Sequence, residues 1–346
     1  MVTLISIGIN GYGTIGKRIA DAVLKNPNFK LVGVAKYSPD YASKVASRRG
    51  IDIFVPEEKW GDFEKIGVTP KGTIEDFLNM SSIIIDASPG GKGLINLALY
   101  KGAGKRAIFQ GGEKPEVAEV SYSSYCNFYD AVGKRYVRVV SCNTTGLLRV
   151  VCILHREFHV RTVKALIIRR GADPREDSRG PINSIKLETL EEISHHARDA
   201  NTVVPSLHIE TQAVVVPTTL MHVQYLDIEF ETPVSKSKII ETLSSYNRFL
   251  IIDPKKSGVD STSKIIEVAR DVSRSRNDIY ENIVFENTVR VSGNNLSLIQ
   301  AIHQESIVIP ENIDAVYAIS NAGLSMEQAL AETDRYLGVG SLKDVF

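Results

Sequence analysis

The stretch Leu4-Ile5-Ser6-Ile7-Gly8-Ile9-Asn10-Gly11-Tyr12-Gly13-Thr14-Ile15-Gly16 decides the fold of the first part of the chain. Its apolar run ends in glycines that fit G-x-G-x-x-G, and apolar residues at helical spacing follow from Thr14 to Lys25. A β-rich run over 29–35 completes a strand–helix–strand unit, in which small residues let the backbone approach a pyrophosphate at the helix N-terminus. A tight structural turn is the alternative. We predict a dinucleotide site that includes Gly11, Gly13, Thr14, Ile15 and Gly16.

Strand-like and helical patterns alternate over about the first 140 residues, and this alternation predicts an α/β fold with a doubly wound parallel sheet of Rossmann type. After Cys142 a helical segment at 147–158 precedes longer strand-like runs, which favour an α+β domain with a largely antiparallel sheet. Two helical segments, 305–320 and 325–336, close the chain. We expect a dinucleotide-binding (Rossmann) domain at 1–140, a catalytic domain at 141–303, and C-terminal helices within 304–346 that pack back on the Rossmann domain.

The composition is that of an ordinary globular protein. The 346 residues are 43% hydrophobic and 24% charged, with 41 basic and 41 acidic side chains. Zero formal net charge gives no field that attracts nucleic acid or anionic lipid. No run approaches ~20 apolar residues, and the start of the chain lacks the pattern of a signal peptide. We expect a cytoplasmic protein with no nucleic-acid or membrane partner, and the seven histidines show no metal constellation.

The end of the second predicted strand bears on cofactor choice. NAD-selective sites usually carry an acidic residue there, which bonds the ribose 2′-hydroxyl. This sequence has Val34-Ala35-Lys36-Tyr37-Ser38-Pro39-Asp40, so Lys36 stands in the place of the acid and would attract a 2′-phosphate. We predict that NADP is accepted and preferred, while Asp40 leaves use of NAD open. The alternative is that Lys36 is a solvated surface lysine.

The most informative stretch is Ser141-Cys142-Asn143-Thr144-Thr145, which follows a predicted strand and opens a helix. A cysteine at a helix N-terminus has its thiolate stabilised by the helix dipole, which lowers the pKa from ~8.5. Thr144 and Thr145 are capping or substrate hydroxyls, and Cys142 is the predicted nucleophile. An inert buried thiol is the alternative, against which the polar surroundings argue.

Landmarks along nearly the whole chain resemble the glyceraldehyde-3-phosphate dehydrogenase family, in particular its archaeal branch. In order they are Asn10–Gly16, Ile108–Glu113, Ser141–Thr145, Ser194–His196, Pro217–His222 and His303–Ser306. The resemblance implies that Cys142 attacks the aldehyde of glyceraldehyde 3-phosphate, that hydride passes to NADP or NAD, and that inorganic phosphate releases 1,3-bisphosphoglycerate from a thioester. It also implies a reversible step of glycolysis and gluconeogenesis, and a homotetramer.

The resemblance also assigns roles to individual residues. It implies that His222 is the base and then the acid, where a hydrogen-bonded sheet histidine is the alternative. His195 and His196 look like substrate contacts and, being adjacent, are expected to point in different directions. Two arginines end a predicted strand and suit bidentate phosphate binding, unless they form a solvated basic edge. The residues expected to bind the substrate are Ser141, Asn143, Thr144, His195, His196 and Arg169. The residues expected to bind the cofactor are those of the glycine turn together with Lys36, Gly111, Gly112, Arg170 and Gln304.

Members of the family with cysteines at both places suggest a disulfide between Cys126 and Cys152 as a hypothesis. Two kinds of rival function stay open. One is a related enzyme of the same chemistry, an aspartate-semialdehyde or erythrose-phosphate dehydrogenase. The other is a non-catalytic protein that binds the cofactor as a sensor, against which Cys142 and His222 count.

Overall fold

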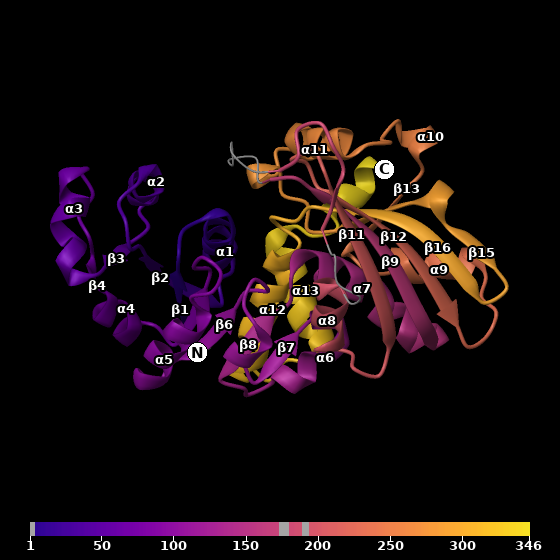
Figure 1. Ribbon diagram of the computed structural model, residues 1–346. Helices are drawn as coiled ribbons and strands as arrows, with labels where there is room; N and C mark the ends of the chain where they lie inside the picture. Colours follow the sequence, from indigo (N-terminus) through magenta and orange to yellow (C-terminus); the bar gives the residue numbers. More distant parts are fainter. Residues whose placement is uncertain (1–3, 173–179, 189–193) are drawn as a thin grey trace. The chain divides into compact units, whose positions relative to one another are not determined.

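The computed structural model describes residues 4–172, 180–188 and 194–346 (Figure 1). The chain divides into two compact units. Unit 1 comprises Met1–Val139 and Ile309–Leu337, and unit 2 comprises Val140–Val308 and Gly338–Phe346. Asp173 and Pro174, which follow the predicted arginine pair, lie outside the described residues.

Unit 1 is built on an eight-stranded sheet in the order β4-β3-β2-β1-β5-β6-β8-β7, and every pairing in it is parallel. The strands are β1 (Ile5–Asn10), β2 (Phe29–Ala35), β3 (Ile53–Val55), β4 (Gly72–Thr73), β5 (Ile83–Asp86), β6 (Arg106–Phe109), β7 (Val120–Tyr122) and β8 (Tyr136–Val139). The chain runs outward on both sides of β1 and β5, so the strand order reverses between them. Such a reversal marks the place where doubly wound sheets bind ligands, and it confirms the predicted fold class.

The helices of unit 1 come from both ends of the chain. They are α1 (Thr14–Lys25), α2 (Tyr41–Arg48), α3 (Trp60–Lys65), α4 (Ile74–Met80), α5 (Gly93–Gly102), α6 (Ser124–Asn127), α12 (Val308–Ser320) and α13 (Met326–Leu337). Tyr317 of α12 packs its ring 4.9 Å from that of Phe29 and accepts a 2.9 Å hydrogen bond from Asn26. These contacts attach the C-terminal helices to the first strand–helix–strand unit.

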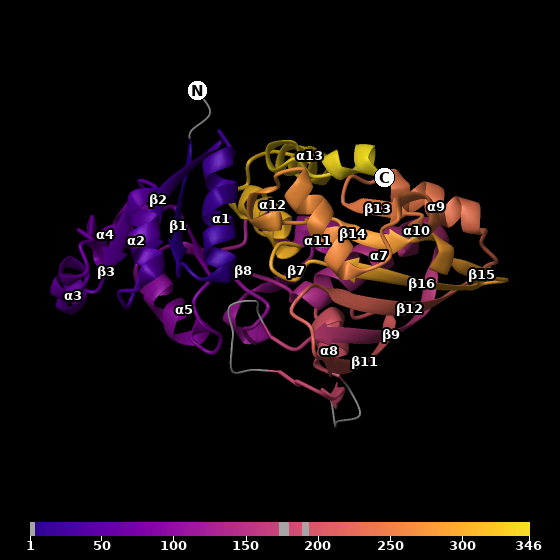
Figure 2. The same cartoon turned by 90° about the horizontal axis from the view of Figure 1, so that it is seen from above.

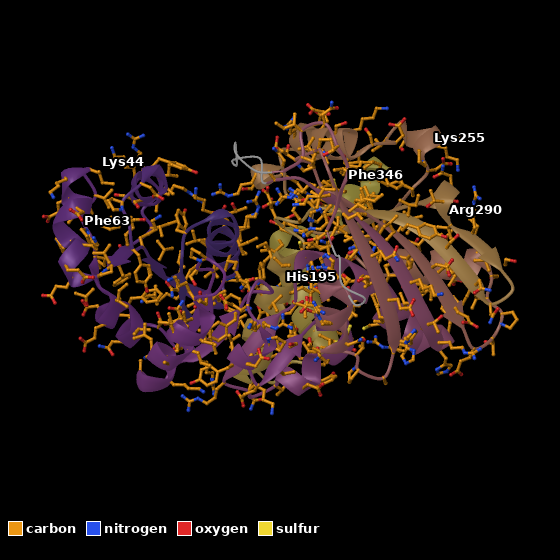
Figure 3. All side chains as sticks on the ribbon, in the orientation of Figure 1. Lys44, Phe63, His195, Lys255, Arg290 and Phe346 are labelled. Carbon is orange, nitrogen blue, oxygen red and sulfur yellow. The ribbon has the colours of Figure 1, made fainter. Side chains whose placement is uncertain are left out.

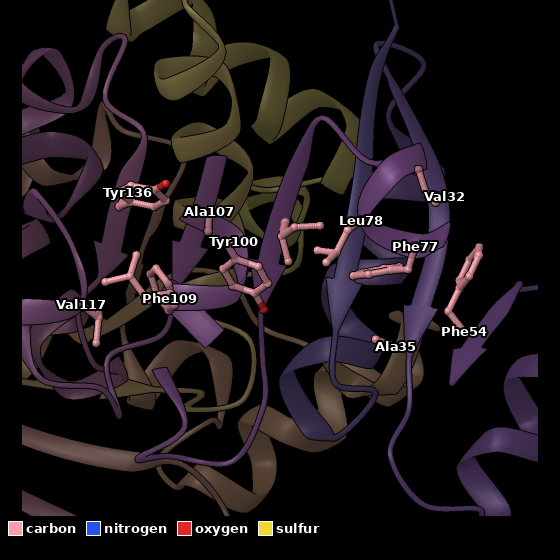
Figure 4. Close-up of a cluster of buried hydrophobic side chains, with 12 residues drawn as sticks. Val32, Ala35, Phe54, Phe77, Leu78, Tyr100, Ala107, Phe109, Val117 and Tyr136 are labelled. Carbon is pink, nitrogen blue, oxygen red and sulfur yellow. The ribbon is translucent and has the colours of Figure 1, made fainter. Parts of the chain in front are cut away.

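A core of aromatic and aliphatic side chains lies beside the sheet of unit 1, and Figure 4 shows Phe54, Phe77, Tyr100 and Phe109 within it. Phe77 reaches β1 because Gly8 has no side chain. A Cβ at Gly8 would lie 2.6 Å from the Phe77 ring and 2.4 Å from the Ser81 hydroxyl oxygen. The glycine therefore lets α4 pack directly on the central strand.

Unit 2 contains a second eight-stranded sheet in the order β10-β11-β9-β12-β16-β14-β13, with β15 paired to β16. Its strands are β9 (Val160–Arg170), β10 (Lys186–Leu187), β11 (His208–Val216), β12 (His222–Phe230), β13 (Phe249–Ile252), β14 (Asn282–Phe285), β15 (Arg290–Ser292) and β16 (Asn295–Ile302). The β9–β11 and β13–β14 pairs are parallel, and the other five are antiparallel. The sheet is thus largely antiparallel, as predicted.

The parallel pairs follow from the helices that lie between their strands in sequence. A parallel connection needs a crossover, and α8 (His195–Asn201) separates β9 from β11. The pair β13–β14 is separated by α10 (Pro254–Ser257) and α11 (Thr262–Asp271). The remaining helices are α7 (Cys142–Phe158), which contacts β9, β12 and β16, and α9 (Lys236–Ser244), which contacts α7 and β13 (Figure 2).

Candidate active site

Cys142 is the first residue of α7, and the residues around it cap the helix. Ser141 is the N-cap, where its hydroxyl oxygen accepts from the Thr144 N–H and lies 2.9 Å from the Thr144 hydroxyl. The Ser141 N–H donates to a carboxylate oxygen of Asp199 at 3.0 Å. Capping of this kind fixes the first turn, so the cysteine side chain has a defined place at the helix N-terminus. Ser141 and Thr144, both predicted substrate contacts, have these capping bonds in the structure.

A buried row of amides holds the first turn of α7 against the sheet. Gln224 of β12 donates to the backbone oxygen of Asn143 at 2.9 Å and to its side-chain oxygen at 3.2 Å. Gln300 of β16 donates to Gln224 at 2.8 Å and to the carbonyl oxygen of Gly146 at 3.0 Å. Asn282 donates to the same carbonyl oxygen at 2.7 Å. Because these groups are buried and bonded to one another, each fixes the position of the next.

His222 shares the inward face of β12 with Gln224, because alternate residues of a strand point to the same side. That face is the one on which the first turn of α7 rests, through the Gln224–Asn143 bonds. The structure therefore places His222, which is 2% exposed, on the side of the sheet that carries the helix N-terminus.

The hydrogen bonding of His222 defines its resting tautomer. The backbone N–H of Arg170 donates to Nδ1 of His222 at 3.1 Å, so a neutral ring carries its proton on Nε2. Burial, and then the charges of Arg169 and Arg170, hold the pKa of His222 well below its usual 6.5. The ring is thus neutral near pH 7, and in this resting tautomer its Nε2–H is a hydrogen-bond donor.

The titration of Cys142 differs from what the sequence predicts. Burial raises the pKa of the thiol above its ordinary value, although Arg169, Arg170 and the N–H groups of Asn143 and Cys142 act to lower it. The prediction of a lowered pKa is therefore wrong for the free chain. Its physical reason is that the loss of water around the sulfur outweighs the helix N-terminus and the two guanidinium groups. Position at a helix start is visible in a sequence, whereas the depth of the side chain is not.

His195 and His196 open α8, with Ser194 as its N-cap, and Figure 3 marks His195. Their ring centroids lie 3.9 Å apart, so the prediction that the two rings point in different directions is wrong. Their exposure does differ, since His196 is buried and His195 is exposed. Burial, and then the positive charge of Arg169, lowers the pKa of the His196 ring to about 4.

Glu188 is the residue of this region that the sequence does not indicate. Its carboxylate forms an ion pair with Arg169 and lies 3.9 Å from Nε2 of His195 and 3.6 Å from Nε2 of His196. Glu188, His195 and His196 have their ligand atoms within 4.8 Å of one another, a spacing that a metal ion also requires. The guanidinium in direct contact with the carboxylate opposes a cation, and it favours an anion at this place.

The glycine turn of unit 1 fits a dinucleotide. Gly11 has φ +101°, and a Cβ there would lie 2.6 Å from the carbonyl oxygen of Ala87, while a Cβ at Gly16 would lie 2.0 Å from that of Gly11. Gly13 is the N-cap of α1 and provides no side-chain cap. The first N–H groups of α1, at Thr14 and Ile15, therefore have no capping side chain and are suited to an anionic pyrophosphate.

Two more predicted cofactor residues lie at the same sheet edge of unit 1. Gly111 and Gly112 form a turn just after the carboxyl end of β6, closed by the Glu113 N–H donating to Gln110 at 3.0 Å. A Cβ at Gly112 would meet nothing within 4 Å. Carboxyl ends of parallel strands share one edge of a sheet, so this turn and the glycine turn after β1 lie at that common edge.

Lys36 follows the carboxyl end of β2 and is 9% exposed, so it is not a solvated surface lysine. Its ammonium lies 2.8 Å from a carboxylate oxygen of Asp40, whose other oxygen accepts from the Ser43 N–H at the start of α2. In unit 2, Gln304 is buried, and neither its side-chain oxygen nor its nitrogen has a hydrogen-bond partner. An unsatisfied buried amide is uncommon and fits a group that bonds to a ligand.

Together, these features define a class. A doubly wound sheet with a pyrophosphate-type glycine turn is joined in one chain to an α+β unit, which carries a cysteine at a helix N-terminus, a buried histidine and two arginines whose charges act on both side chains. That combination is typical of nicotinamide-dependent oxidoreductases that work through a cysteine.

Comparison with known proteins makes the assignment specific. The family described as glyceraldehyde 3-phosphate dehydrogenase, C-terminal domain, matches residues 141–301. Proteins named glyceraldehyde-3-phosphate dehydrogenase from Metallosphaera sedula, Hyperthermus butylicus and Aeropyrum pernix are 49%, 48% and 47% identical to the chain. The matches cover 97%, 97% and 98% of this chain and 98%, 97% and 98% of those proteins. The chain belongs to the glyceraldehyde-3-phosphate dehydrogenase family, and it is an oxidoreductase that uses a nicotinamide cofactor.

No helix within the described residues combines the length and the apolar composition that crossing a membrane requires.

Proposed function

We propose that this chain catalyses the reversible phosphorylating oxidation of D-glyceraldehyde 3-phosphate to 1,3-bisphosphoglycerate, with NADP or NAD as hydride acceptor. The near full-length identity to proteins named for that activity carries the proposal, since it spans both the glycine turn and the cysteine helix. The step belongs to glycolysis and gluconeogenesis, and central carbon metabolism of this kind operates in the cytoplasm.

Cys142 is the proposed nucleophile. Its thiolate forms a C–S bond with the aldehyde carbon and gives a thiohemiacetal oxyanion, and loss of hydride from that carbon leaves a thioester. Attack by inorganic phosphate then breaks the C–S bond and restores the thiolate. Support comes from the helix start, from the two guanidinium groups that lower the pKa of the thiol, and from the adjacent N–H groups suited to an oxyanion.

His222 is the proposed acid–base group. Its neutral state near pH 7 leaves it able to accept a proton, and such a group typically contributes ~10²–10⁴-fold. In the resting tautomer, the Nε2 proton donates to the oxygen that gains charge on the substrate. Uptake of a proton at Nε2 requires the other tautomer, which breaks the bond from the Arg170 N–H. We therefore expect the role of base to involve a small movement of this ring.

Anion binding in unit 2 is assigned to Arg169, with His195 and His196 beside it and with Ser141, Asn143 and Thr144 at the cysteine. Burial lowers the pKa of Arg169, and a partly desolvated guanidinium binds phosphate more strongly than one in water. Both ring nitrogens of His196 are buried without hydrogen-bond partners, which supports a ligand contact.

The cofactor, when bound, supplies a nicotinamide ring that takes up hydride. Gly11, Gly13, Thr14, Ile15 and Gly16 are proposed to hold its pyrophosphate, with Gly111 and Gly112 beside it. Gln304 and Arg170 are also proposed as cofactor contacts. The unsatisfied amide of Gln304 and the uncapped start of α1 support these assignments.

NADP is the proposed preferred cofactor, with NAD also used. Lys36 supports this because its side chain is nearly buried at the end of β2, where its positive charge would attract a 2′-phosphate. Asp40 pairs with that ammonium, so a 2′-phosphate has to compete with the carboxylate. We therefore expect the preference for NADP to be moderate rather than absolute.

A steady-state assay tests the activity. Glyceraldehyde 3-phosphate should give cofactor reduction with NADP and with NAD, and omission of phosphate should stop turnover after one acylation per site. Aspartate semialdehyde and erythrose 4-phosphate, assayed side by side, should react far more slowly. Sustained turnover without phosphate would indicate a non-phosphorylating dehydrogenase, and no reaction with any aldehyde would favour a cofactor-binding sensor.

We also propose a homotetramer and a disulfide between Cys126 and Cys152. The approach of Cys126 and Cys152 to disulfide distance supports the latter, and Cys142 is a free thiol. A thiol count under non-reducing denaturation should find one free thiol per chain, whereas three would exclude the bond. Sedimentation of the native protein tests the tetramer.

A further inference from the structure

The carboxylate of Glu188 lies where the basic groups of unit 2 converge. Arg169 forms an ion pair with it, and Nε2 of His196 and of His195 lie 3.6 Å and 3.9 Å from its oxygens. Glu188 follows β10, the edge strand of the sheet, while Arg169 comes from β9 and the histidines from the start of α8. Basic groups from two separate elements thus surround one anionic group.

The hydrogen bonding around this carboxylate is incomplete. One oxygen of Glu188, Nε of Arg169 and both ring nitrogens of His196 are buried and have no hydrogen-bond partner. Buried polar groups in native proteins are normally paired, and unpaired ones are costly. A carboxylate has two oxygens, while a phosphate has at least three with which to satisfy the same donors. The surroundings therefore suit a larger anion better than the one that occupies them.

We propose that Glu188 is an internal competitor for phosphate: in the free enzyme its side chain occupies an anion subsite formed by Arg169 and His196, and an incoming phosphate group displaces it. Glu188 thereby sets how tightly the enzyme binds inorganic phosphate or the phosphate of its substrate. The inference rests on the proposed function, because it assumes that Arg169 and His196 contact a phosphate.

The opposite role for Glu188 is to position Arg169. In that case the carboxylate would hold the guanidinium in the geometry that binds phosphate, and loss of the carboxylate would weaken binding. If the carboxylate is a competitor, its removal should instead strengthen phosphate binding, because the guanidinium of Arg169 becomes free to bind the ligand. The sign of one measured change therefore separates the two roles.

The experiment is a calorimetric titration of inorganic phosphate into the full-length enzyme, without aldehyde or cofactor. Glu188→Gln keeps the shape of the side chain and removes its charge. The matched control is Glu210→Gln, because Glu210 also pairs with a histidine, His208 at 2.8 Å, but on the exposed part of β11. We expect Glu188→Gln to bind phosphate roughly twofold to fivefold more tightly, as for the loss of one partly exposed ion pair, and Glu210→Gln to match the parent.

A second readout is independent of phosphate. The carboxylate partly neutralises Arg169, whose charge lowers the pKa of the Cys142 thiol. Glu188→Gln should therefore speed alkylation of Cys142 at a fixed pH near 8, provided that the circular dichroism spectrum is unchanged. Slower alkylation together with unchanged or weaker phosphate binding would overturn the proposal.

The two hypotheses fail in different ways. An enzyme that oxidises glyceraldehyde 3-phosphate normally, but whose Glu188→Gln variant binds phosphate no more tightly than its parent, would disprove the competitor and leave the proposed function intact. A chain without that activity would disprove the function, while the titration would still report on the anion subsite.

Discussion

Replacement of Gly146 by alanine should disturb the helix that carries the cysteine. Gly146 lies in the second turn of α7, and a Cβ there would come 2.8 Å from Cγ2 and 3.1 Å from Cδ1 of Ile302 on β16. Real Cβ atoms essentially never approach other heavy atoms below 3.0 Å, so Ile302 or the helix has to move. Movement of the helix would stretch the bonds that Asn282 and Gln300 donate to the Gly146 carbonyl oxygen.

Three terms set the change in the free energy of unfolding, and the first opposes the other two. Alanine favours a helix interior by about 1 kcal/mol over glycine, whereas overpacking of a buried site costs about 1–3 kcal/mol. Weakening either buried hydrogen bond adds about 1 kcal/mol to the cost. We expect a net loss of roughly 1–3 kcal/mol in the free energy of unfolding, the result of these three terms, together with slower alkylation of Cys142.

Urea unfolding followed by circular dichroism measures this loss, and iodoacetamide labelling measures the thiol. Gly61→Ala is the control, because Gly61 lies in α3 and its added Cβ would meet nothing within 4 Å, so that variant should gain stability. Ile302→Ala removes both clashing atoms, and the double variant with Gly146→Ala should lose less than the sum of the single losses. A Gly146→Ala variant that gains about 1 kcal/mol would show that the added methyl group meets no clash, since the higher helix propensity of alanine alone explains such a gain.

Three further predictions concern charge. Arg169→Gln removes a cation that lowers the pKa of Cys142, so that pKa should rise further and alkylation at a fixed pH should slow; an unchanged profile would show that the guanidinium does not act on the sulfur. Lys36→Glu should lower kcat/KM with NADP relative to NAD by at least about tenfold, equivalent to 1.4 kcal/mol, and an unchanged ratio would exclude a 2′-phosphate contact. For His196 the folded pKa of about 4 lies below the ordinary 6.5, so the unfolded chain binds the proton more readily in that window and stability should fall by about 3 kcal/mol as the pH drops from 6.5 to 4. His196→Asn should reduce this loss of stability between pH 6.5 and 4, as measured by urea unfolding. If the free energy of unfolding fell equally steeply in the variant, groups other than His196 would be responsible for the pH dependence.

The parts of the fold that the sequence predicts well have regular local patterns. The glycine turn, β2 and α7 combine a periodic apolar pattern with glycines or a cap, so their type and approximate bounds follow from nearest neighbours in sequence. The short strands β3 and β4 have no such pattern and take their place only by pairing with β2 and with each other. The parallel pair β13–β14 likewise depends on the crossover between them.

The candidate site residues also fall into two groups, those that have a local signal in the sequence and those whose role depends on residues far away in the sequence. Cys142 is predictable because its position at a helix start is a local property, and His222 because the motif before it resembles a family pattern. Glu188 has no local signal, since its meaning comes only from Arg169 and His196 on other elements. The burial of Lys36 and the raised pKa of Cys142 are equally invisible in sequence, because both depend on how much water the folded chain excludes.

The thioester at Cys142 is tested most directly by mass spectrometry of the enzyme quenched in acid after reaction with glyceraldehyde 3-phosphate and NADP in the absence of phosphate. We expect one 3-phosphoglyceroyl group per active chain, attached to the peptide that contains Cys142 and removed when phosphate is added before the quench. An unmodified Cys142 peptide in a preparation that has reduced one equivalent of cofactor would contradict the thioester, as would an acyl group found on another residue.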